Sequence, residues 1–64
     1  MNYLRKVICK ELKINATFAD QSYALRLFTK LYDKGFKVQL EDFFTKESVK
    51  TDDKNFEKLL KKVN

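Results

Sequence analysis

The hydrophobic residues of this chain recur at three- and four-residue intervals in several segments, a spacing typical of helices rather than strands. In the first segment, residues 3–13, four apolar side chains share one helical face: Leu4, Val7, Ile8 and Leu12. Three basic side chains fall on another face: Lys6, Lys10 and Lys13. Asn15 then interrupts the pattern. We therefore expect a first helix over residues 3–13.

Residues 18–34 are expected to form the central helix. Its apolar positions cover more than half of the helical circumference, so it must contact several neighbours: Tyr23, Ala24, Leu25, Leu27, Phe28, Leu31 and Tyr32. Thr17 and Asp20 resemble a capping box at its start. Gly35, the only glycine of the sequence, stands where a left-handed C′ residue is needed. Phe36 follows at C″, from where it packs on Leu31 in a Schellman motif.

Two shorter elements are expected after Gly35. Residues 36–40 alternate apolar and polar side chains, which favours a short extended segment. Residues 40–47 predict a short helix, with two acids in its first turn and three apolar side chains on one face: Glu41 and Asp42, then Leu40, Phe43 and Phe44.

The last predicted helix covers residues 52–63 and is capped by Thr51 or Asp52. A narrow apolar stripe indicates a peripheral helix with one contact face: Phe56, Leu59, Leu60 and Val63. Acids come early and lysines late, the order that the helix dipole favours.

These elements predict a single all-α domain, residues 1–64, with three to four helices around residues 18–34. The alternative is an α+β fold with a short strand near residues 36–40. A chain of 64 residues builds only a small core, and its one cysteine forbids an internal disulfide. Aromatic packing and association, with a target or as a homodimer, remain as sources of stability.

The net charge of +5 comes from 14 basic and nine acidic residues and is unevenly placed along the sequence. Residues 1–14 carry a surplus of three in Arg5, Lys6, Lys10 and Lys13 against Glu11. A second basic face lies on the last predicted helix: Lys54, Lys58, Lys61 and Lys62. Arg, the preferred bidentate reader of phosphates and bases, is scarce, and the many Lys, Asn, Phe, Ile and Tyr codons indicate an AT-rich gene.

Enzyme chemistry has little support in the sequence. There is no His, and one glycine cannot form a phosphate-binding loop. Cys9 without His cannot form a zinc site, and burial as a small apolar residue is favoured over a reactive thiol. The acids around Asp52 are better explained by helix capping than by a metal. We expect no catalytic residue, cofactor or metal.

Glu11 is unusual because it falls within the apolar arc of the first predicted helix. Either this face is an exposed contact surface, or the carboxylate reaches past the rim to a Lys or a Tyr hydroxyl.

Two functions are carried forward. The first is a small non-catalytic regulator or inhibitor, of the kind that phages and mobile elements encode, which binds an acidic surface of a partner protein. Its expected contacts combine a helix face, the N-terminal basic residues and exposed aromatics: Arg5, Lys6, Lys10, Lys13, Phe43 and Phe44. Core positions are favoured for Phe43 and Phe44, and this function requires that one of them stays exposed instead. The alternative is a small DNA- or RNA-binding protein that uses the N-terminal basic stripe, or the face of Lys54, Lys58, Lys61 and Lys62. No stretch resembles a membrane span or secretion signal, so a complete, cytoplasmic protein is expected.

Overall fold

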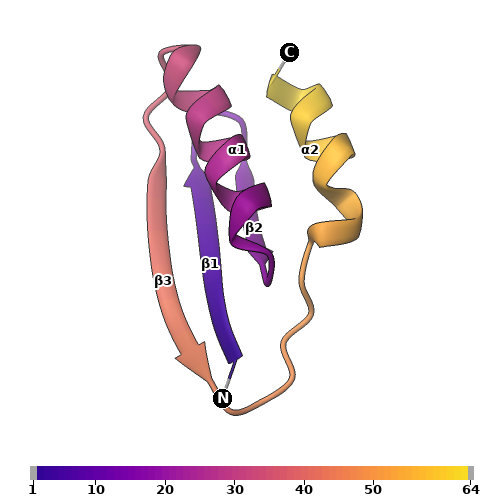
Figure 1. Ribbon diagram of the computed structural model, residues 1–64. Helices are drawn as coiled ribbons and strands as arrows, with labels where there is room; N and C mark the ends of the chain where they lie inside the picture. Colours follow the sequence, from indigo (N-terminus) through magenta and orange to yellow (C-terminus); the bar gives the residue numbers. More distant parts are fainter. Residues whose placement is uncertain (1, 64) are drawn as a thin grey trace.

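The chain folds into a three-stranded antiparallel sheet with two helices, an α+β architecture (Figure 1). The computed structural model describes residues 2–63. The elements in chain order are β1 (Asn2–Cys9), β2 (Ile14–Phe18), α1 (Gln21–Asp33), β3 (Gln39–Thr45), the 3-10 turn η1 (Asp53–Asn55) and α2 (Phe56–Val63). The sheet has the order β2-β1-β3, so β1 is central. The all-α helical bundle predicted from the sequence is therefore wrong.

The first predicted helix, residues 3–13, is instead β1 and the turn after it. In the register with β2, Val7 pairs with Ala16 and Cys9 with Ile14, on the face that α1 covers. Leu4 and Ile8 point to the opposite face. A central strand that carries apolar side chains on both faces loses simple alternation, and the remaining spacing imitates a helix.

A four-residue turn joins β1 to β2 and contains none of the usual glycine signals. The N–H of Lys13 donates to the carbonyl of Lys10 at 3.2 Å, and Lys13 adopts a positive φ of 55°. Left-handed backbone is uncommon for a lysine, so nothing in the sequence marks this hairpin. Asn15, expected to interrupt a helix, lies within β2.

The predicted helix over residues 40–47 is also wrong, because these residues form most of β3. Phe44 lies on the helix-covered side and Phe43 on the opposite side, consistent with their neighbours Tyr3 and Lys6. The α+β alternative names the observed class, but its strand lies at Gln39–Thr45 rather than at residues 36–40, and it omits the β1–β2 hairpin.

Helix α1 confirms the predicted central helix, although it begins at Gln21 rather than at residue 18. Its N-cap is Asp20, whose carboxylate accepts from the backbone N–H and the hydroxyl of Ser22, while Thr17 belongs to β2. The predicted Schellman motif is present. The N–H of Phe36 donates to Leu31 and that of Gly35 to Tyr32, at 3.1 and 3.0 Å, and Gly35 has a φ of +88°.

The core lies between the sheet and the two helices. Its fully buried members come from β1, β2, α1 and α2: Val7, Cys9, Ile14, Ala16, Phe18, Ala24, Leu27, Leu31, Phe56 and Val63. Helix α2 docks beside α1 through aromatic packing, since Phe56 stacks on Tyr23 at 4.6 Å and meets Phe18 edge-on at 6.1 Å. Leu4 is also buried but lies outside this cluster, on the opposite face of the sheet.

The last predicted helix is confirmed as η1 followed by α2, and Asp52 occupies the N-cap position as predicted, but its side chain makes no capping hydrogen bond. The carboxylate of Asp52 accepts from the backbone N–H of Thr17 at 3.0 Å rather than from its own helix, and the N–H of Asp52 donates to the Thr17 carbonyl at 2.7 Å. Asp53 accepts from the N–H groups of Ala19 and Asp20 at 3.1 Å. Asp52 therefore fastens the start of α2 to the outer edge of β2, and Asp53 fastens it to the connection between β2 and α1.

Candidate partner-binding site

The N-terminal basic residues do not form one stripe, because β1 sends alternate side chains to opposite faces. Arg5 lies on the helix-covered side, where its guanidinium binds Asp42 (Nε–Oδ1 2.6 Å) and Tyr3 (Nη2–Oη 3.1 Å). Its side chain is only 15% exposed. Lys6 lies on the other face, with its ammonium 5.8 Å from the centre of the Phe43 ring. The helical stripe predicted from Arg5, Lys6, Lys10 and Lys13 does not exist.

Lys10 and Lys13 remain exposed in the β1–β2 turn. This turn lies at the same end of the molecule as the C-terminal ends of α1 and α2 (Figure 1). Seven lysines lie in the three segments that meet there, together with two acids: Lys10, Lys13, Lys30, Lys34, Lys37, Lys61 and Lys62, with Glu11 and Asp33. We call this region the basic end.

The surplus of five positive charges at the basic end equals the net charge of the whole chain. The rest of the sequence holds seven basic and seven acidic residues. Lys61 and Lys62 of the second predicted basic face belong to the basic end, whereas Lys54 and Lys58 share their part of the chain with Asp53 and Glu57. The fold therefore gathers a charge that the sequence spreads over three distant segments.

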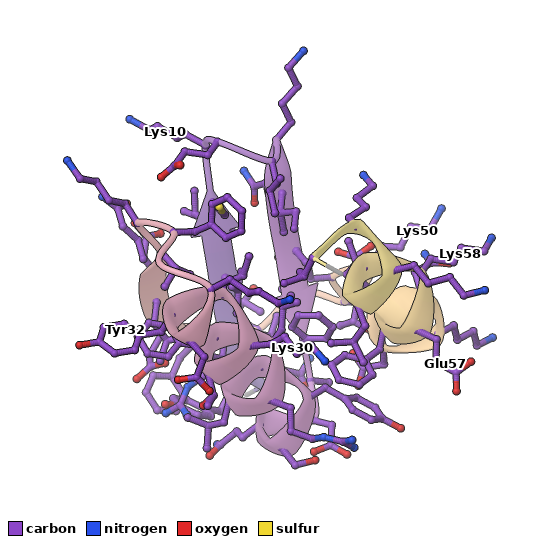
Figure 2. All side chains as sticks on the ribbon, turned by 90° about the horizontal axis from the view of Figure 1, so that it is seen from above. Lys10, Lys30, Tyr32, Lys50, Glu57 and Lys58 are labelled. Carbon is purple, nitrogen blue, oxygen red and sulfur yellow. The ribbon has the colours of Figure 1, made fainter. Side chains whose placement is uncertain are left out.

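A hollow of about 590 Å³ opens at the basic end, and we call it the end pocket. Its apolar lining comes from β1, the end of α1 and the connection to β3: Ile8, Tyr32, Phe36 and Val38. Its polar lining consists of Lys10, Glu11, Lys37 and Gln39. Viewed from above, Lys10 and Tyr32 lie on the same side of the molecule, away from α2 (Figure 2).

Two sets of hydrogen bonds hold the wall of the end pocket. The Schellman motif fixes the direction in which the chain leaves α1, and Phe36 and Val38 pack against the core. The carboxylate of Glu11 accepts from the backbone N–H of Lys37 at 3.1 Å, which ties this connection to the β1–β2 turn. Glu11 is thus exposed and bound to backbone, rather than to the Lys or Tyr side chain considered from the sequence.

Tyr32 is the most exposed large apolar side chain of residues 2–63, at 69%, and its ring stacks on the half-buried Phe28 at 6.2 Å. The apolar pattern of residues 18–34 predicts that Tyr32 packs against neighbouring elements, and nothing in the sequence indicates a role for Lys37. Gly35 predicts where the chain turns after α1. Nothing in the local sequence predicts that residues 36–38 lie beside the β1–β2 turn.

The two phenylalanines proposed as partner anchors differ in environment. Phe44 is 65% exposed and rests against Tyr3, with ring centres 4.8 Å apart. Phe43 is half-buried beneath Lys6. Both lie on β3, at the opposite end of that strand from the end pocket.

Over residues 2–63, no group of three or more His, Cys, Asp or Glu side chains is arranged to hold a metal ion. Asp52 and Asp53 are engaged by backbone N–H groups, and Cys9 is a free, fully buried thiol. The same part of the chain contains no helix long and apolar enough to cross a membrane. No protein-family model, curated protein or solved structure matches the chain.

Proposed function

We propose that this chain is a small non-catalytic regulatory or inhibitory protein that binds an acidic segment of a partner protein at the end pocket. The observation that carries the proposal is the coincidence of an apolar hollow with the end of the molecule that holds the entire positive surplus. The seven-to-seven charge balance elsewhere makes that end the natural place for an acidic partner to dock.

The apolar and charged parts of the end pocket have different tasks. One aliphatic or aromatic side chain of the partner enters between Tyr32 and Phe36, and burying such a side chain contributes about 1.5–3 kcal/mol. Acidic groups beside it meet Lys10 and Lys37, where each exposed ion pair adds about 0–1 kcal/mol. The apolar anchor therefore sets most of the affinity, and the lysines set orientation and the rate of association.

A selection from a random peptide library tests this proposal and requires no named partner. Peptides that bind the wild-type chain are expected to combine acids with a large apolar residue. Their affinity should fall about tenfold or more in the variant Lys10→Glu/Lys37→Glu, and also in Tyr32→Ala.

Matched controls exist on the same chain. Lys46→Glu/Lys50→Glu alters exposed lysines away from the end pocket by the same total charge, and Phe44→Ala removes another exposed aromatic. Both should bind the selected peptides within about threefold of the wild type. Enrichment of basic peptides, or equal losses in the two double variants, would contradict the proposal.

Nucleic acid is the second candidate partner, and the basic end is again the observation that favours it. This alternative requires binding to a short duplex or single strand that weakens steeply between low and moderate salt. The log–log slope should fall in magnitude in Lys61→Glu/Lys62→Glu, a change distant in sequence from the end-pocket lysines. Absence of binding at low salt excludes it.

The buried, unpaired thiol of Cys9 is compatible with a reducing compartment, and we place the proposed binding in the cytoplasm. The encoding of the chain by a phage or mobile element remains a proposal from its composition.

A further inference from the structure

The two outer edges of the sheet, those of β2 and β3, differ in their backbone hydrogen bonding. The outer edge of β2 is occupied at Thr17, because its N–H and carbonyl are both bound by Asp52. Within residues 2–63, no other segment gives or takes a backbone hydrogen bond along the outer edge of β3. An open strand of seven residues is a ready template for another strand.

The groups that β3 presents outward follow from the pairing of Thr17. Because Thr17 faces Asp52, its partner Lys6 must direct its own N–H and carbonyl away from β2 and toward Glu41. Glu41 and Phe43 are therefore bonded to β1. Leu40, Asp42 and Phe44 offer their backbone groups at the free edge.

We propose that this edge pairs with the β3 of a second copy of the chain, antiparallel and about a two-fold axis at Phe43. The result is a homodimer with one continuous six-stranded sheet. This interface is separate from the end pocket, which lies at the opposite end of β3, and the two proposals stand independently.

Charge selects the register. Two β3 strands can pair antiparallel through their outward backbone groups about several two-fold axes. Three of these axes pair five or more residues of each strand, and they pass at Glu41, Asp42 or Phe43. An axis at Glu41 or at Asp42 sets that carboxylate directly opposite its own copy, which is unfavourable. The axis at Phe43 avoids this, since Asp42 then faces the second copy's Phe44 and Glu41 faces its Thr45.

The same register joins apolar surfaces. Leu4 pairs with Phe43 within one chain, so the axis at Phe43 creates an unbroken row across both copies: Leu4, Phe43, Phe43 and Leu4. On the helix-covered side, the exposed Phe44 of each copy lies beside the other copy's Asp42, so the ring meets the Arg5–Asp42 ion pair rather than a second carboxylate.

The overall charge does not oppose this arrangement. Each β3 runs from the basic end toward Thr45, so antiparallel pairing near Thr45 sends the two basic ends to opposite extremes (Figure 1). Gln39 lies four residues from the axis, which separates the basic ends by about 27 Å along the strands. That distance exceeds the Debye length of about 8–10 Å.

Two substitutions of opposite charge at Phe44, measured by sedimentation equilibrium, test both the dimer and its register. Phe44→Asp creates two opposed Asp–Asp pairs per dimer and should weaken association about tenfold or more. Phe44→Lys also removes the aromatic ring but faces Asp42, so its dissociation constant should stay within about threefold of the wild-type value. A wild-type monomer at about 1 mM, or an equal response of the two variants, would overturn the proposal.

A disulfide provides a second readout. Phe43→Cys places two thiols on the axis, with Cα atoms about 4.5 Å apart, within the range that a disulfide spans. Thr45→Cys is the matched control, because its copies lie about 14 Å apart in this register. Mild oxidation should cross-link the first variant and leave the second and the wild type, whose Cys9 is buried, as single chains. Equal cross-linking of both variants would also overturn the register.

Discussion

Individual carboxylates give the fold a defined response to acid. The hydrogen bond from Arg5, with a smaller one from Tyr3, holds the pKa of Asp42 below its ordinary value of 3.8. Hydrogen bonds from the hydroxyl and then the N–H of Ser22 hold the pKa of Asp20 below the same value. Both pKa values are lower in the folded chain than in the unfolded one, so both groups stabilise it fully above about pH 5.

This stabilisation is lost as the pH falls through the folded pKa values. The midpoint of urea unfolding should therefore decrease from about pH 5 to about pH 2. In Asp20→Asn/Asp42→Asn the midpoint should start lower at neutral pH and decrease less steeply. An identical acid dependence in wild type and variant would show that these hydrogen bonds do not persist in solution.

Two strand phenylalanines, Phe18 and Phe44, should differ strongly in their response to truncation. Phe18 is fully buried between the sheet and α2, so Phe18→Ala should cost about 3–5 kcal/mol and leave a chain this small largely unfolded. Phe44 is mostly exposed in the single chain, so Phe44→Ala should change its unfolding free energy by less than about 1 kcal/mol at monomer concentrations. Chemical denaturation followed by circular dichroism measures both.

At the scale of elements, α2 depends on its hydrogen bonds to β2 and to the connection between β2 and α1 as well as on Phe56. Asp53→Ala removes the acceptor of the Ala19 and Asp20 N–H groups, which are exposed and can bind water instead, so it should cost about 0.5–1.5 kcal/mol. Asp53→Asn keeps one acceptor oxygen and should cost less. Amide hydrogen exchange should accelerate at Ala19 and Asp20 in the alanine variant, while the amides of β3 keep the protection expected for the wild type.

The helices could be predicted from the sequence, and the strands could not. Both ends of α1 carry local signals, in Asp20 and in the Gly35–Phe36 turn, and α2 has a clear apolar stripe. Strand β1 is apolar on both faces, and Phe43 and Phe44 of β3 point to opposite faces while keeping helical spacing from Leu40. For these strands, pairing between distant segments outweighs local periodicity.

At the scale of the whole molecule, the site was only partly foreseeable. Lys10 stays a predicted partner-binding residue, and the residues that surround it come from α1 and from the connection to β3. Arg5 and Lys6 are separated by the sheet itself. The net charge can be counted from the sequence. Its position at one end of the molecule depends on the fold, which brings the β1–β2 turn and the C-terminal ends of α1 and α2 together (Figure 1).

The placement of the chain ends has a practical consequence. β1 begins at Asn2 at the end of the sheet where Phe43 and Phe44 lie, while α2 finishes at Val63 at the basic end. A bulky fusion at the N-terminus would therefore crowd the strand edge, and one at the C-terminus would crowd the lysines. An affinity tag at the N-terminus would therefore obstruct the β3 edge alone, and the same tag at the C-terminus would obstruct the basic end alone. A protein tagged at both termini would have both surfaces obstructed.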